Sequence, residues 1–290
     1  MPMEKILKAR GIVAVAFAAS SLSRKVCRSL MGSLQHVATC IHAGRPFLQR
    51  LRQRESHLHR FQRVPVTPDM QQDLLWWWRV LHTPYLNGVS LEYFNALPAP
   101  DITVEMDAPD YGLCALDVSS QAALTYQFTA DERELIAAFK EGAPNGFDIN
   151  FRELLSCAYA VHVWGCSVGR NGRPRHVLFR IDNASAVAWQ NKLALQNPRA
   201  QVIIRLLSWW ETSFQLRFSA SHVAGTDSER ADAGSRLAAN PSYAAKFSSL
   251  TPGWSQVSPT VDIQGLADIW LCISERTPLP TPRSINTGEL

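Results

Sequence analysis

The sequence predicts an α/β protein in which a mixed sheet flanked by helices follows a small basic helical segment. Three observations lead to this prediction. Basic residues are concentrated in the first 66 positions, and the spacing of apolar residues changes from helical to alternating after residue 100. Three strand-like stretches then precede an alternation of helices and strands. We expect a helical segment over 1–95, a sheet domain over 101–240, and a poorly structured tail rich in Ser, Thr and Pro over 241–290.

Charge is divided unevenly along the chain. Residues 1–66 hold twelve Lys or Arg and two acidic residues, a net charge of +10, whereas the remaining residues hold 17 basic and 23 acidic residues, a net charge of −6. This division of charge suits a protein whose basic part binds a polyanion and whose acidic part binds cations. A solvated basic helix surface without a partner accounts for the same charge equally well.

The basic segment is expected to be helical over residues 20–63, because its apolar residues recur at helical spacing. Its outward arginines are candidates for contacts with a phosphate backbone: Arg50, Arg52 and Arg54. Another helix is expected from residue 67, where a capping Thr precedes Pro. That helix carries three consecutive tryptophans, which cannot all lie on one face, so at least one must meet another domain, a ligand or solvent.

The composition indicates an intracellular protein of the cytoplasm or nucleus. The apolar run at 11–19 imitates a secretory signal, but it is short and continues into another basic helical stretch, so no signal peptide is expected. No stretch reaches the roughly 18 apolar residues of a membrane span. The six cysteines are scattered with no C-x-x-C pair, which argues against a zinc knuckle and a disulfide framework.

The sheet domain is predicted from periodicity. Alternating apolar residues and turn residues indicate strands at 102–107, 111–118, 122–128, 176–181 and 215–220. Helical spacing indicates helices at 131–140, 150–164, 184–193, 198–212 and 227–239, the first of which is a polar insertion.

Four acidic residues fall at informative positions in this pattern. Asp107 and Asp182 end strands, whereas Glu153 and Asp232 lie on helices that could pack beside those strand ends. Clustered carboxylates repel one another, and divalent cations relieve the repulsion. Each acid also has a structural interpretation: Asp182 could cap the next helix, and Asp232 could pair with a neighbouring arginine, Arg230 or Arg236.

Four ordered motifs contain these acids: residues 104–112 (VEMDAPDYG), 150–155 (NFRELL), 179–187 (FRIDNASAV) and 221–236 (SHVAGTDSERADAGSR). Together they resemble the RNase H domain of reverse transcriptases, most of all that of DIRS-like and Ty3/gypsy-like retrotransposons. In that family the acids occur in this order, on the first strand, the first helix, the fourth strand and the last helix. The resemblance covers about 140 residues, and four motifs in order are specific where any one alone would be weak.

The resemblance implies an RNase H-like fold and a nuclease that hydrolyses the RNA strand of RNA–DNA hybrids. The four acids would hold two Mg²⁺ ions, for which Mn²⁺ may substitute, and His222, on a mobile loop, would assist proton transfer or product release. Asn183 and Ser185 would contact the nucleic-acid backbone, although capping of the next helix explains them equally well. Pro109 departs from the family pattern, where a hydroxyl residue is usual.

Upstream stretches at 33–40 and 44–51 resemble the thumb and connection of the same polymerases, and 73–78 resembles their linker into RNase H. No Tyr-x-Asp-Asp motif of the palm occurs, so no polymerase activity is expected. The chain is therefore expected to be a piece of a larger polyprotein or a truncated copy, with the polymerase palm of the parent polyprotein as a possible partner.

Two other functions are compatible with the sequence. The first is a catalytically inactive nucleic-acid-binding remnant, which Pro109 and the missing palm favour and the four acids oppose. The second is a DDE-type integrase or transposase, which shares the fold. The helix-borne Glu153 in second place and the motif from His222 to Asp232 weigh against that function.

Overall fold

The computed structural model describes residues 2–56, 59, 61–83, 97–169, 174–275 and 277. The chain divides into two compact units, one formed by Met1–Asn95 with Asp268–Leu290 and the other by Ala96–Ala267. The division falls within helix α11 (Ile263–Glu275). We call these parts the helical unit and the sheet unit.

In the described residues before 84, the helical unit has four α-helices, a 3₁₀ turn at His42–Gly44 and a short antiparallel strand pair. The helices are α1 (Met3–Ala18), α2 (Arg24–Cys40), α3 (Pro46–Ser56) and α4 (Pro68–Leu81). Strand β1 (Ser21–Ser23) pairs with β2 (Arg63–Pro65) and buries Leu22 opposite Val64. The expectation of helical structure over 20–63, with a break at 44–46, is therefore wrong where β1 and β2 form, because their pairing satisfies backbone groups that a helix would have used.

The three tryptophans of α4 lie on different faces, as expected. Trp76 and Trp77 are buried; the Trp76 ring stacks on Phe47 with centroids 4.0 Å apart, and the Trp77 indole N–H donates to the carbonyl of Phe47 at 3.3 Å. Trp78 is half-buried and lies beside the ring of His82. Two tryptophans are thus core residues of the helical unit.

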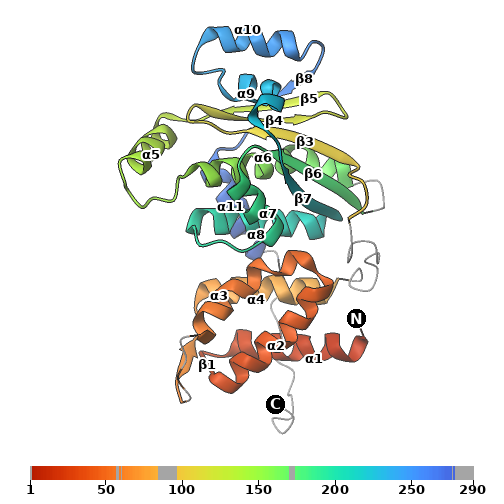
Figure 1. The fold of residues 1–290 in the computed structure, drawn as a ribbon. Helices are drawn as coiled ribbons and strands as arrows, with labels where there is room; N and C mark the ends of the chain where they lie inside the picture. Colours follow the sequence, from red (N-terminus) through yellow and green to blue (C-terminus); the bar gives the residue numbers. More distant parts are fainter. Residues whose placement is uncertain are drawn as a thin grey trace. The chain divides into compact units, whose positions relative to one another are not determined.

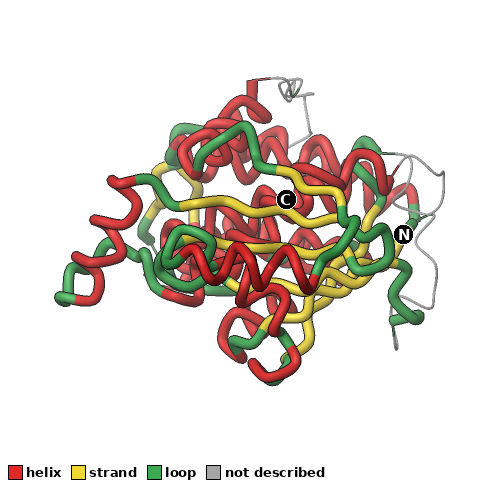
Figure 2. Tube along the Cα trace, turned by 90° about the horizontal axis from the view of Figure 1, so that it is seen from above, coloured by secondary structure: helices red, strands yellow, loops and turns green. Residues whose placement is uncertain are grey.

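The sheet unit is built on a six-stranded mixed sheet in the order β7–β6–β3–β4–β5–β8. Its strands are β3 (Ile102–Asp107), β4 (Gly112–Asp117), β5 (Ala122–Gln127), β6 (Arg175–Ile181), β7 (Leu216–His222) and β8 (Ser255–Val257). The meander from β3 to β5 is antiparallel, whereas β3–β6, β6–β7 and β5–β8 are parallel pairs. The strands lie side by side in Figure 2. The predicted α/β class and mixed sheet are confirmed.

Helices cover both faces of this sheet (Figure 1). On one face lie α6 (Ile149–Gly169), α7 (Ala184–Lys192) and α8 (Pro198–Ser213); on the other lie α9 (Glu229–Ser235) and α10 (Pro241–Leu250). Helix α5 (Ala130–Lys140) begins with a capping box of Thr129 and Glu132. A short 3₁₀ turn, Gly225–Asp227, precedes α9.

The expectation of a poorly structured tail from residue 241 is wrong for the residues that the structure describes. Phe247 of α10 is buried against Cys114, Leu116 and Ala123, so α10 completes the core on the α9 face. Strand β8 extends the sheet by pairing with β5. The sheet unit therefore continues well past residue 240, while residues 278–290 lie outside the described part.

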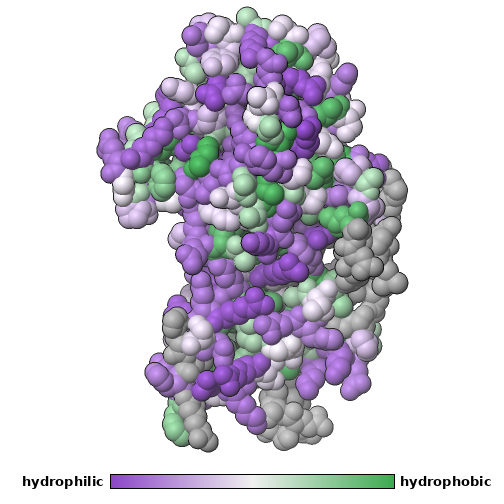
Figure 3. All heavy atoms as spheres, in the orientation of Figure 1, coloured by the Kyte–Doolittle hydropathy of each residue, from purple (hydrophilic) through white to green (hydrophobic). Residues whose placement is uncertain are grey.

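Hydrophilic side chains cover most of the surface shown in Figure 3, where apolar side chains form small separate groups. Among the described residues, every helix is too short or too polar to cross a bilayer.

Candidate metal centre

Two of the predicted acids meet because their strands are parallel neighbours. β3 and β6 pair in parallel, with Val104 opposite Phe179 and Glu105 opposite Arg180. Asp107 is the last residue of β3, and Asp182 directly follows β6. The carboxyl ends of parallel strands lie at one edge of a sheet, which is where ligands commonly bind in open α/β sheets.

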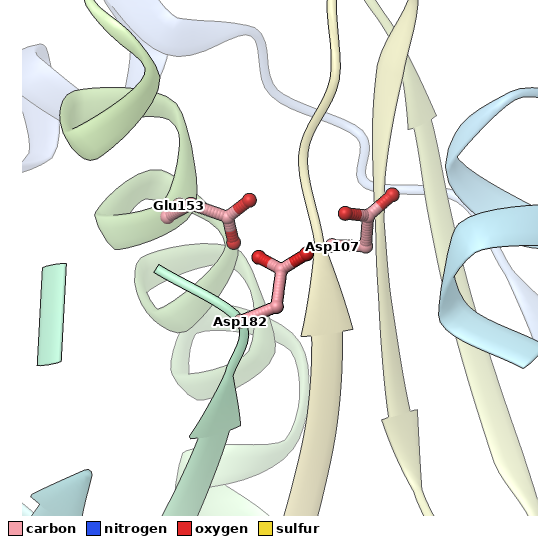
Figure 4. A group of neighbouring side chains, drawn as sticks. All are labelled: Asp107, Glu153 and Asp182. Atoms are coloured by element: carbon pink, nitrogen blue, oxygen red, sulfur yellow. The ribbon is translucent and has the colours of Figure 1, made fainter. Parts of the chain in front are cut away.

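The third acid reaches this edge from a helix. Glu153 projects from α6 toward the ends of β3 and β6, and the carboxyl groups of Asp107, Glu153 and Asp182 converge (Figure 4). One carboxylate oxygen of each residue lies within 4.8 Å of the others. We call these three residues the carboxylate triad.

The triad is poorly solvated. Asp107 is 7% exposed and Glu153 is 1% exposed, whereas Asp182 is half-buried. Glu153 Oε1 accepts a hydrogen bond from the backbone N–H of Ala108 at 3.1 Å. Its other oxygen, Oε2, is buried and has no hydrogen-bond partner among the described residues. A buried carboxylate oxygen without a partner is costly, and a bound cation would satisfy it.

Burial and neighbouring negative charges raise the pKa of all three carboxyl groups. Burial, opposed by a hydrogen bond from Ser235 and assisted by the charges of Asp182 and Asp232, raises the pKa of Asp107 from 3.8 to about 6. Burial, with the charges of Asp107 and Asp182, raises the pKa of Glu153 well above its usual value. Burial also raises the pKa of Asp182, which His222 partly offsets.

Asp232, the fourth predicted ligand, lies near the triad but outside it. Its charge raises the pKa of both Asp107 and Asp182. Its Oδ1 accepts a hydrogen bond from Nε of Arg236 at 2.6 Å. The predicted pairing with Arg236 is thus present, whereas Arg230 instead binds Glu105 at 3.1 Å and lies over the ring of Trp254.

Two supporting residues were not anticipated. The hydroxyl of Ser235 donates to Oδ2 of Asp107, and it lies 2.9 Å from the carbonyl oxygen of Asp232. The spacing of Ser235 three residues after Asp232, on the same helix face, is the signal that could have found it. Arg152, next to Glu153, is buried and donates to the carbonyl of Ala108 at 3.3 Å and to Asp110 at 3.1 Å. No sequence pattern indicated this role.

The remaining site predictions have mixed outcomes. His222 was expected on a loop, but it is the last residue of β7, exposed, with Nε2 3.0 Å from the carbonyl oxygen of Asp182. Asn183 caps α7 by accepting hydrogen bonds from the N–H groups of Ser185 and Ala186, so its capping interpretation is confirmed. The side chain of Ser185 is exposed.

The three predicted arginines belong to the helical unit and differ from one another. Arg50 binds the buried Asp73 at 3.4 Å and the carbonyl of Asp69 at 3.0 Å, so it links α3 to α4. Arg52 and Arg54 are exposed on α3. Of the three, Arg52 and Arg54 therefore remain the candidates for contacting a polyanion.

Comparison of the chain with models of protein families, with curated proteins and with solved structures finds no match. The fold and the geometry of the site therefore carry the functional argument.

Proposed function

We propose that the sheet unit is an RNase H-like nuclease that uses divalent cations to hydrolyse the RNA strand of RNA–DNA hybrids, as part of a retroelement reverse transcriptase. The observation that carries this proposal is the carboxylate triad at the ends of β3 and β6, with oxygens within 4.8 Å of one another. Buried carboxylates gathered so closely repel one another, so they indicate a cation that balances them.

The donor set fits a hard cation. Asp107, Glu153 and Asp182 offer oxygen atoms alone, and the unpartnered Oε2 of Glu153 is available as a ligand. Mg²⁺ prefers such ligands and retains several waters or substrate oxygens, and Mn²⁺ accepts the same set. Bound there, Mg²⁺ would lower the pKa of an attacking water and stabilise the leaving oxygen of a phosphodiester.

The chain's own residues would position this chemistry. Ser235 holds Asp107, the N–H of Ala108 holds Glu153, and Arg152 fixes the loop after β3 through the carbonyl of Ala108. His222, exposed beside Asp182, would exchange protons with solvent during product release.

The topology supports the RNase H-like assignment. The acids lie in the family's order: on the first strand (β3), on the first helix that packs against the sheet (α6), after the fourth strand (β6), and on α9. An antiparallel meander followed by the parallel strands β6 and β7 is compatible with an RNase H-like sheet, although α10 and α11 follow the helix that carries the fourth acid.

The test is cleavage of a labelled RNA–DNA hybrid with Mg²⁺ or Mn²⁺ by the full chain. We expect the wild-type chain to cleave the hybrid. Asp107→Asn and Asp182→Asn should each abolish cleavage, whereas the exposed control Asp131→Asn should cleave like the wild type. Absence of cleavage by a folded wild-type chain that still binds the hybrid would exclude the nuclease.

A second function has one observation in its favour. Arg236 neutralises Asp232 at 2.6 Å, as it would in a catalytically inactive nucleic-acid-binding remnant whose acidic centre no longer needs to bind two ions. Calorimetric titration with Mn²⁺ separates the two functions, because the remnant would bind hybrid without binding the ion at the triad.

A further inference from the structure

Arg236 places a positive charge beside the carboxylate triad. It follows α9, and its Nε contacts Oδ1 of Asp232 at 2.6 Å, with both side chains 34% exposed. Its charge also lowers the pKa of Asp107 and Asp182, which places it within electrostatic range of the triad. A guanidinium so close to carboxylate ligands competes with a cation for them.

The backbone of Asp232 lies beside the carboxylate triad, whereas its side chain is bound to Arg236. The Ser235 hydroxyl contacts both the Asp107 carboxylate and the Asp232 carbonyl, so the helix turn that carries Asp232 is held beside Asp107. The Asp232 carboxylate is nevertheless outside the group of mutually close ligand oxygens. The Asp232 side chain is 34% exposed, so it has room to change rotamer without a movement of the helix.

We propose that Arg236 is a latch that holds Asp232 away from the metal centre until a phosphate of the bound nucleic acid takes the guanidinium. This inference rests on the proposed nuclease function and deepens it by making the second cation depend on substrate. Arginine binds phosphate oxygens bidentately and with charge assistance, so a backbone phosphate can compete with one carboxylate. The released Asp232 then becomes a ligand of the second ion, whose remaining positions are filled by waters or by that phosphate.

The latch predicts a sequence of binding events. The chain alone binds one divalent cation, at Asp107, Glu153 and Asp182. The second ion binds after the hybrid, so the complete two-ion centre forms only when the substrate is bound. Arg236 acts here as a positioning residue, through Asp232, rather than on the reacting atoms.

The experiment counts Mn²⁺ bound per chain from the electron paramagnetic resonance signal of the free ion. It uses the full chain with and without a 2′-O-methyl RNA–DNA hybrid, which binds without being cleaved. We expect the wild type to bind one ion alone and two with the hybrid. Arg236→Gln should bind two ions without the hybrid, whereas the charge-preserving control Arg236→Lys should bind one. Asp232→Asn should bind one ion in both conditions.

The outcomes separate the latch from the function on which it rests. Two ions bound by the wild type alone, or one ion bound by Arg236→Gln alone, would overturn the latch and leave the nuclease intact. If the wild type still binds one Mn²⁺ ion when the hybrid is bound, the proposed transfer of Arg236 from Asp232 to a phosphate is overturned. Failure of the wild type to bind any ion would overturn the metal centre itself, and the latch with it.

Discussion

Glu153 combines a nearly complete loss of solvent with an unpartnered oxygen. It is 1% exposed, its Oε1 is bound to Ala108, and its Oε2 has no hydrogen-bond partner among the described residues. Proteins retain such unfavourable arrangements where function requires them. Glu153 therefore destabilises the metal-free protein, and it leaves one carboxylate oxygen available to bind a cation.

We predict that Glu153→Gln stabilises the metal-free protein at pH 8 and removes its response to metal. The amide carries no charge and can donate a hydrogen bond toward Asp107 and Asp182, which relieves the buried unpartnered oxygen, a gain of about 1–3 kcal/mol. Thermal melting with EDTA and then with Mn²⁺ measures both effects. The exposed control Glu134→Gln should melt like the wild type in both solutions. A lower melting temperature for Glu153→Gln in EDTA would contradict the prediction.

Asp107 gives the apo protein a pH-dependent stability of defined sign. Its folded-state pKa of about 6 lies above the ordinary 3.8, so folding favours the protonated form. This preference stabilises the folded protein fully below pH 4, and the stabilisation is lost as the pH rises through about 6. The free energy of unfolding should fall by about 3 kcal/mol over that range. Urea denaturation in EDTA should show this loss between pH 4 and pH 7. Asp107→Asn should lose less stability over this range, because only the contributions of the other buried acids remain, and an equal loss in that variant would assign the effect to those groups.

At the scale of elements, α10 belongs to the core of the sheet unit. Gly234 of α9 shows how closely this layer packs, because an added Cβ would lie 2.5 Å from Sγ of Cys114 and 2.7 Å from the ring of Phe247. Phe247, from α10, fills the remaining space and is 4% exposed. The helix that follows the predicted domain boundary therefore helps to hold α9, and with it Ser235 and Asp232.

We predict that Phe247→Ala destabilises the chain by about 3–5 kcal/mol, the usual cost of removing a buried aromatic ring. Chemical denaturation followed by circular dichroism measures this cost. Tyr111→Ala, which removes an aromatic side chain that is 42% exposed in the same unit, should cost far less. Equal costs for the two variants would show that α10 is only loosely attached.

The sequence predicted the regular elements between residues 101 and 240 because their burial gives the apolar residues a regular spacing, whereas α10 was missed in a stretch that its composition marked as a tail. The strand expected at 102–107 is β3, and the helix expected at 184–193 differs from α7 by one residue. β8 left no such trace, since it is three residues long and joins the sheet through its backbone. Strands β1 and β2 were missed for the same reason, because each gains its stability from a partner about forty residues away.

The candidate site was predictable where residue type alone limits the chemistry. Carboxylates at strand ends indicated Asp107 and Asp182, and the motif order added Glu153 and Asp232. The contacts of Arg152 and Ser235 depend on how a helix approaches a loop, and the pairing of Arg50 with Asp73 depends on how α3 meets α4. These are tertiary properties, which spacing along the chain does not encode.

At the scale of the whole molecule, the chain separates its charges between a basic stretch and an acidic centre. Residues 1–66 carry a net charge of +10, and the exposed basic residues of the helical unit include Arg52 and Arg54 on α3 and Lys5 and Lys8 on α1. Clustered basic side chains raise the affinity for a polyanion through counterion release, without reading its sequence. This long-range attraction would offset the repulsion between a hybrid and the acidic residues of the sheet unit.

We predict that the double variant Arg52→Gln/Arg54→Gln binds an RNA–DNA hybrid more weakly and with a lower dependence on salt. Each phosphate contact contributes roughly 0.9 to the slope of log K against log salt concentration, so losing two should lower the slope by about 1–2. Fluorescence anisotropy at several salt concentrations measures the slope. The matched variant Lys5→Gln/Lys8→Gln removes the same charge from α1 of the same unit and should change the slope less. Equal reductions would mean that the helical unit attracts the hybrid through its total charge, whereas an unchanged slope in both variants would remove α3 from the nucleic-acid interface.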